Sequence, residues 1–169
     1  MSNHAARWQF KEVHLGEFKL HIAIDFGTDG LGIAYAVHDE VFVHTKWKSN
    51  RNREAVTDKP KTIILFDEKG ERQAFGVDAK YTYMNLGPDA QREWMLFDRF
   101  KMSLFEDNVH NSNSVSISDT LTATNGKSYP SEKVFIAAYQ YIAERSQKWL
   151  MHEKSLQAKK DEIQWIITV

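Results

Sequence analysis

Residues 20–30 read LHIAIDFGTDG, the strongest β-strand signal in the chain. Apolar residues occupy every second position from Leu20 to Ile24, which is the pattern of a half-buried strand. The strand runs into a glycine-rich turn, and two further apolar runs, 31–38 and 41–47, follow it on either side of a short acidic break. We therefore expect a β-meander of three strands over residues 20–47.

The turn after the first strand has the residue types of a phosphate-binding loop. Gly27, Gly30 and Gly32 would let the backbone come close to a ligand. Successive turn amides form a concave anion site, and the Thr28 hydroxyl can add a hydrogen bond. Asp25, at the strand end, is a hard oxygen ligand suited to Mg²⁺, directly or through water. The same residues are also compatible with a plain hairpin turn, so both interpretations stay open at this point.

The middle of the chain predicts short elements joined by turns. A β-branched run at 62–66 and the segment 73–76 indicate two strands, and Pro88 opens a helix that is expected to carry Trp94 and Phe97. The Asn125–Gly126 pair indicates a small hairpin from residue 120 onwards. The Ser- and Asn-rich stretch 107–119 is expected to be a mobile loop.

The clearest helix begins at Pro130–Ser131, with Ser131 expected to cap it. Its apolar face has helical spacing and consists of Phe135, Ala138, Tyr139, Ile142, Trp149 and Leu150. Residues 163–169 then predict a final β-strand, and the chain stops inside it. Because such a strand would leave its neighbouring edge and face uncovered, we expect this chain to be the N-terminal part of a longer protein.

Composition narrows the function classes. Over 169 residues, Lys plus Arg (22) nearly equals Asp plus Glu (23), giving a formal net charge of −1. This balance argues against a nucleic-acid partner, and the basic stretch 46–61 is better explained as a solvated loop. The chain has no cysteine, which excludes disulfides, thiolate catalysis and Cys-ligated zinc. With no secretory signal and no run of about 20 apolar residues, we expect no membrane span and a cytoplasmic location.

A family resemblance starts at the same turn. Asp25-Phe26-Gly27-Thr28 resembles the first phosphate motif of the superfamily of actin, sugar kinases and 70-kDa heat-shock ATPases. Five later segments resemble that superfamily in the same order: 62–66, 74–80, 97–102, 125–132 and 163–169. The sequence of these motifs is most similar to that of the divergent heat-shock 70 kDa protein 12A/12B branch. The residues that carry this similarity are Trp94-x-x-Phe97, Phe100-Lys101-Met102 and Leu121-Thr122-Ala123-x-Asn125-Gly126-Lys127. The resemblance covers about residues 20–169.

The resemblance implies an α/β fold with a ribonuclease-H-like mixed sheet, here as the first lobe only of an actin-like ATPase. Residues 20–47 and 131–169 would form the core of that lobe. Residues 48–130 would form an inserted small α+β subdomain, and residues 1–19 an N-terminal tail.

The resemblance also implies roles for individual residues. Asp25 would hold Mg²⁺ through water, and Lys101 would be the lysine that approaches the γ-phosphate and the attacking water. Arg99 competes with Lys101 for that role, because the family lysine lies two residues after its Asp and Lys101 lies three after Asp98. The implied nucleotide-binding residues are Asp25, Gly27, Thr28, Asp29 and Gly30.

Asp29 departs from the family pattern, which usually has a second Thr at this position. A carboxylate next to a triphosphate repels it by about 1 kcal/mol or more at short range unless a metal intervenes. The implied function is binding of ATP or ADP with Mg²⁺ by a chaperone-type ATPase. The full-length protein would hydrolyse ATP and bind unfolded or client proteins through downstream regions, while this chain alone would be inactive. The alternatives are a non-catalytic interaction module with a decayed phosphate loop, and a sugar-kinase-like member of the same superfamily.

Overall fold

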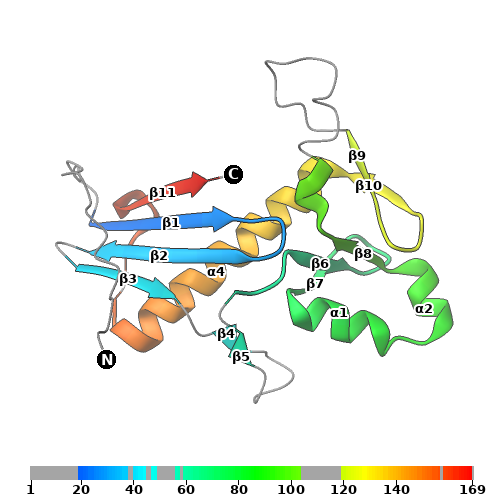
Figure 1. The fold of residues 1–169 in the computed structure, drawn as a ribbon, viewed down its shortest axis with the longest axis horizontal. Helices are drawn as coiled ribbons and strands as arrows, with labels where there is room; N and C mark the ends of the chain where they lie inside the picture. The colour runs from blue at the N-terminus through cyan, green and yellow to red at the C-terminus, as the bar shows by residue number, and fades with distance from the viewer. Residues whose placement is uncertain are drawn as a thin grey trace, which may run out of the picture.

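Two β-sheets lie at opposite ends of one long helix, α4 (Figure 1). The computed structural model describes residues 19–37, 40–44, 47–48, 56–57, 59–103, 119–156 and 158–168. The strands are β1 (Leu20–Phe26), β2 (Leu31–Val37), β3 (Glu40–His44), β4 (Trp47–Lys48), β5 (Val56–Thr57), β6 (Ile63–Phe66), β7 (Arg72–Phe75), β8 (Met95–Asp98), β9 (Thr120–Thr122), β10 (Ser128–Pro130) and β11 (Ile163–Thr168). The helices are α1 (Val77–Met84), α2 (Pro88–Glu93) and α4 (Ser131–Lys154), with 3₁₀ turns η1 (Phe100–Met102) and η3 (Lys160–Glu162). The chain is therefore mixed α/β, as predicted.

The first sheet has the strand order β11-β1-β2-β3. The three N-terminal strands pair antiparallel in sequence, which confirms the predicted meander. The C-terminal strand β11 adds parallel to β1, from Leu20 opposite Ile163 to Asp25 opposite Thr168. The third strand was predicted to run to Trp47, but β3 ends at His44, and β4 pairs with β5 in a separate two-stranded sheet.

The second sheet has the order β7-β6-β8, and all four residues of β6 are buried. Ile64 and Phe66 face the main core, whereas Ile63 and Leu65 pack with Ala79 of α1 in a second cluster. A strand covered on both faces explains why this run is apolar throughout instead of alternating.

The helix predicted to carry Trp94 and Phe97 is shorter than expected, so that prediction was wrong in part. The helix α2 ends at Glu93, and Phe97 lies in β8, where it pairs opposite Ile64 of β6. The run Met95–Asp98 completes the otherwise open edge of β6. Tertiary pairing outweighed the local helical spacing here.

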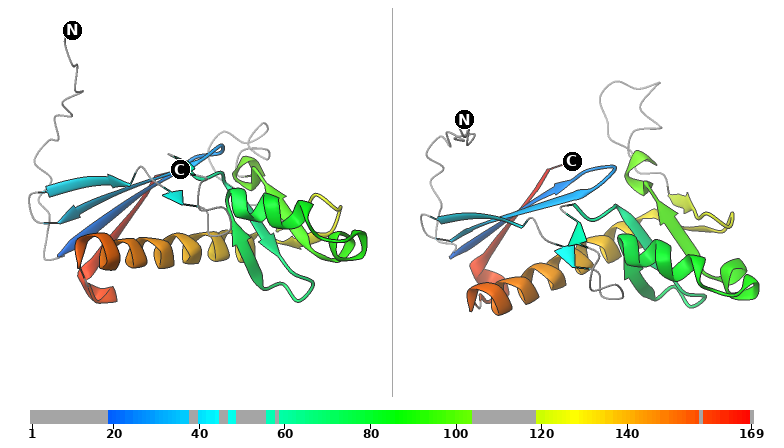
Figure 2. Two further views of the ribbon diagram at one scale, coloured as in Figure 1. Left: turned by 90° about the horizontal axis from the view of Figure 1, so that it is seen from below. Right: turned by 60° about the horizontal axis from the view of Figure 1, so that its bottom comes forward.

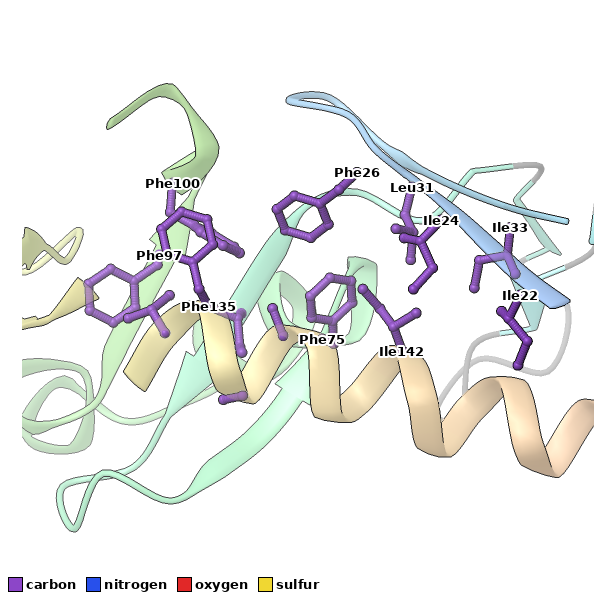
Figure 3. Packing of buried hydrophobic residues seen from close by; sticks show 14 of the residues in the cluster. Ile22, Ile24, Phe26, Leu31, Ile33, Phe75, Phe97, Phe100, Phe135 and Ile142 are labelled. Carbon is purple, nitrogen blue, oxygen red and sulfur yellow. The ribbon is translucent and has the colours of Figure 1, made fainter. Parts of the chain in front are cut away.

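The long helix α4 packs its predicted apolar face against both sheets, and it runs along one face of the four-stranded sheet (Figure 2). Ile22, Ile24 and Ile33 of that sheet point toward α4 (Figure 3). The predicted cap was wrong: Ser131 is the first helical residue, and its buried hydroxyl has no hydrogen-bond partner in the described part of the chain. The helix ends with Ser155 in the left-handed region (φ 51°).

The remaining predictions concern peripheral segments. The predicted hairpin is confirmed, with β9 antiparallel to β10. The predicted loop 107–119 lies outside the described residues except for Asp119, as do the tail 1–19 except for Lys19 and most of the basic stretch 46–61.

Candidate functional site

The turn of residues 27–30 joins β1 to β2, and the residue before it, Phe26, packs against three aromatic side chains. Phe26 is fully buried beneath it, with ring centroids 5.1 Å from Tyr139, 5.9 Å from Phe100 and 6.3 Å from Phe135. The Gly27 N–H donates to the Gly30 carbonyl oxygen at 3.1 Å and closes the turn. Phe100 is the first residue of η1, and Figure 3 shows it together with Phe26. The contact between the two rings therefore holds η1, which contains Lys101, next to the end of β1.

Gly27 is required by the closeness of the turn. A Cβ at this position would lie 2.5 Å from the Gly30 carbonyl oxygen, closer than real side chains come. At Gly32, in the following strand, a Cβ would lie 3.4 Å from the Asp25 Cβ, an ordinary contact. The shape of the turn therefore requires glycine at position 27 whether or not a ligand binds there.

Three hydrogen bonds fix distant segments against this turn. The Thr62 hydroxyl donates to the Gly27 carbonyl oxygen at 2.7 Å, and the Leu31 N–H donates to the Pro60 carbonyl oxygen at 3.0 Å. The Arg99 N–H in turn donates to the Thr62 carbonyl oxygen at 3.3 Å. The start of β6 and the end of β8 are thereby held next to the turn.

The carboxylates of Asp25, in β1, and of Asp29, in the turn, each face a cation from another segment. Asp25 Oδ2 lies 3.6 Å from Lys59 Nζ, and Asp29 Oδ1 lies 3.6 Å from Arg99 Nε. All four side chains are 63–74% exposed. Exposed pairs of this kind contribute at most about 1 kcal/mol, so they set the local charge pattern more than the stability.

A groove of about 500 Å³ opens beside the turn. Its charged lining has three cations, Lys61, Lys80 and Arg99, against two carboxylates, Asp29 and Asp98. The rest of its lining is Thr28, Thr62, Ile63, Val77, Tyr81 and Met84. The groove thus combines an excess of positive charge with an apolar wall supplied largely by α1.

The sequence-predicted residues divide into three places. Thr28 and Asp29 line the groove together with Arg99. Asp25 is not part of the groove lining and lies next to Lys59. Lys101 is only 6% exposed and, within the described residues, is not part of the groove lining, whereas Arg99 is.

The described residues do not form a metal site built from protein ligands alone. In the described part of the chain, no three His, Asp or Glu side chains gather closely enough to hold an ion. The exposed carboxylate of Asp25 fits the other arrangement, in which Mg²⁺ is held mainly by phosphate oxygens and water with one carboxylate nearby.

Sequence reasoning missed Thr62, Lys61 and Lys80 as groove residues. Lys80 lies on α1, whose apolar periodicity is too weak to indicate a helix, since only Asp78, Ala79 and Thr82 of its eight residues are buried. The resemblance of segment 74–80 to the superfamily was the only sequence signal for this region. The position of Thr62 depends on a hydrogen bond to Gly27, 35 residues away, which no local pattern encodes.

Comparison with known proteins agrees with the sequence resemblance. The chain is 30% identical over 155 residues, 90% of its length, to human heat shock 70 kDa protein 12B, and equally to the human and mouse 12A proteins. The chain is a relative of the heat shock 70 kDa 12A and 12B proteins. The resemblance to this 12A/12B branch is thus confirmed. No protein-family model matches the chain.

The match covers only part of the length of the 12A and 12B proteins. The chain spans 22% of the length of each of these relatives, so the relation concerns about a fifth of a heat shock 70 kDa 12 protein. Among its described helices, none is both long and apolar enough to cross a membrane.

Proposed function

We propose that this chain is the N-terminal part of the ATP-binding domain of a heat shock 70 kDa-like ATPase, with turn 27–30 as its phosphate loop. One observation carries the proposal: in a relative of the 12A and 12B proteins, the Gly27–Gly30 turn opens onto a groove lined by Lys61, Lys80 and Arg99. An excess of cations beside a tight backbone turn suits a polyphosphate.

The strand order supports the finer fold assignment within this proposal. Three antiparallel strands followed by a strand parallel to the first, in the order β11-β1-β2-β3, match the start of a ribonuclease-H-like sheet. We divide the chain accordingly into a core of residues 20–47 and 131–169, an inserted α+β subdomain of residues 48–130 and a tail of residues 1–19. The separate sheet β7-β6-β8 supports this division.

The roles within the loop follow from the available donors. The Gly27 N–H is engaged with Gly30, whereas the Thr28 and Asp29 amides donate no backbone hydrogen bond within the described residues. These two amides and the Thr28 hydroxyl would therefore contact phosphate, with Gly27 and Gly30 allowing its approach. Asp25 would hold Mg²⁺ through water. Mg²⁺, when bound, supplies charge neutralisation at the phosphates.

Lys101 is the proposed lysine near the γ-phosphate. Its support is the position of η1 beside the end of β1, through the contact of Phe26 with Phe100. Hydrolysis of ATP, binding of client proteins and a cytoplasmic location belong to the proposal for the full-length protein.

The test is calorimetric titration of MgATP into this chain and into the full-length protein that contains it. On this proposal the described residues would contact the phosphates from one lobe, and immobilising a ligand costs several kcal/mol. We expect binding no tighter than about millimolar, roughly −4 kcal/mol, for this chain, and far tighter binding for the full-length protein.

Two variants sharpen the titration. In the full-length protein, Asp25→Asn should weaken MgATP binding about 10-fold or more, because an outer-shell carboxylate is lost. Glu68→Gln, which removes the same charge from the exposed β6–β7 hairpin, should leave it unchanged. Micromolar binding by this chain alone would contradict the one-sided site, and a full-length protein that does not respond to MgATP would contradict the ATPase assignment.

A second candidate function is a non-catalytic interaction module. Asp29 lines the groove as a carboxylate where the superfamily usually has Thr, and this observation favours a loop that has lost its phosphate ligand. The titration of the full-length protein separates the two candidates, because an interaction module would bind no nucleotide.

A further inference from the structure

Arg99 has a constrained backbone directly beside the phosphate loop. It adopts the left-handed conformation (φ 52°), which is uncommon for a residue other than glycine. Its N–H donates to the Thr62 carbonyl oxygen at 3.3 Å, and its own carbonyl oxygen accepts from the Met102 N–H at 2.9 Å. Hydrogen bonds on both sides therefore hold this residue in an otherwise unfavourable conformation.

The hydrogen-bonded backbone directs the Arg99 side chain into the groove, where its Nε lies 3.6 Å from Asp29 Oδ1. Both side chains remain about 70% exposed, at 70% for Arg99 and 74% for Asp29. An ion pair in water at this separation is weak, so a more highly charged anion can replace the carboxylate. The planar guanidinium is well suited to bind two phosphate oxygens at once.

We propose that Asp29 is the resting counter-ion of Arg99, and that a phosphate group of the nucleotide takes the place of the Asp29 carboxylate at the guanidinium. This inference rests on the proposed function. Asp29 then lowers the affinity for nucleotide by competing for Arg99, instead of acting only by direct repulsion of the phosphates. The Asp29–Arg99 ion pair then sets the affinity of the 27–30 turn for an anion.

The two mechanisms make different predictions for a double-mutant cycle. If Asp29 competes for the guanidinium, Asp29→Asn should strengthen binding about 3- to 10-fold in the wild-type background. The same substitution should strengthen binding by a clearly smaller factor when Arg99 is already Gln, because only direct repulsion remains and there is no cation left to compete for. If Asp29 acts only by repulsion, the Asp29→Asn substitution should strengthen binding by the same factor in both backgrounds.

The cycle is measured on this chain by NMR titration with MgATP and, separately, with inorganic triphosphate, because NMR detects binding in the millimolar range. Lys148→Gln serves as the control for Arg99→Gln, since it removes one exposed positive charge from α4. It should leave both affinities unchanged. Amide spectra of all variants report whether the fold is kept.

A clearly smaller Asp29→Asn effect in the Arg99→Gln background than in the wild-type background supports the counter-ion role. Equal factors in both backgrounds overturn that role and leave the proposed function standing. If the wild-type chain and the full-length protein bind neither MgATP nor triphosphate, both the proposed function and this inference are wrong.

Discussion

Substitution of Gly27 by alanine tests the geometry of the turn directly. The added Cβ would lie 2.5 Å from the Gly30 carbonyl oxygen, whereas real Cβ contacts essentially never fall below 3.0 Å. The two groups must therefore move apart by about 0.5 Å or more. The hydrogen bond that closes the turn has an N–O distance of 3.1 Å, so the same movement would stretch it beyond hydrogen-bonding range.

The expected loss of stability follows from the hydrogen bonds involved. Breaking the Gly27–Gly30 bond costs about 0.5–1.5 kcal/mol. Displacement of the Gly27 carbonyl oxygen also weakens the bond from the Thr62 hydroxyl, by a similar amount. Gly27→Ala should therefore lower the free energy of unfolding by about 1–3 kcal/mol, which corresponds to roughly 3–9 °C in Tm for a chain of this size.

Gly32→Ala is the matched control, because it adds the same methyl group to the same hairpin. Its Cβ would make an ordinary contact of 3.4 Å, and alanine in a strand is no worse than glycine. We expect it to change the free energy of unfolding by no more than about 0.5 kcal/mol. Urea and thermal unfolding followed by circular dichroism measure both variants. Equal stabilities for Gly27→Ala and the wild type would refute the reasoning about the turn.

Two further predictions concern pH and the exposed edge of the first sheet. Burial raises the pKa of Tyr35 from 10.0 to about 12, so the folded state favours the neutral phenol. Between pH 10 and 12 the unfolded state ionises first, and about 2–3 kcal/mol of stability should be lost. In urea unfolding, the free energy of unfolding should fall more between pH 10 and 12 for the wild type than for the Tyr35→Phe variant. Identical pH profiles for the two proteins would contradict this prediction. The edge strand β11 leaves Ile166 42% and Ile167 47% exposed, so Ile167→Lys should reduce concentration-dependent light scattering while changing the unfolding free energy by less than about 0.5 kcal/mol. Unchanged scattering would show that association does not use this edge.

The site could be predicted in part from the sequence, because its turn is continuous in the chain. Asp25 lies near the end of a strand with alternating apolar residues, and Thr28 and Asp29 follow that strand, so their grouping requires no knowledge of distant segments. Lys101 was chosen over Arg99 by resemblance alone. The difference in their exposure, with Lys101 6% exposed and Arg99 in the groove lining, appears only when η1 packs through Phe100 against Phe26.

The sequence by itself determined the elements whose patterns are local: the β-meander, the apolar face of α4 and the final strand β11. Hydrophobic periodicity reports the burial of one face, as in β2 and α4, whereas β11 was indicated by its run of β-branched residues and buries only Ile163. The tertiary structure alone decided that Met95–Asp98 is a strand, because that segment completes the edge of β6. It also decided that Thr62 and Arg99 meet the turn at Gly27 and Asp29. These contacts join residues 35 and 70 positions apart, and such pairings follow from which surfaces remain to be covered once the local elements have formed.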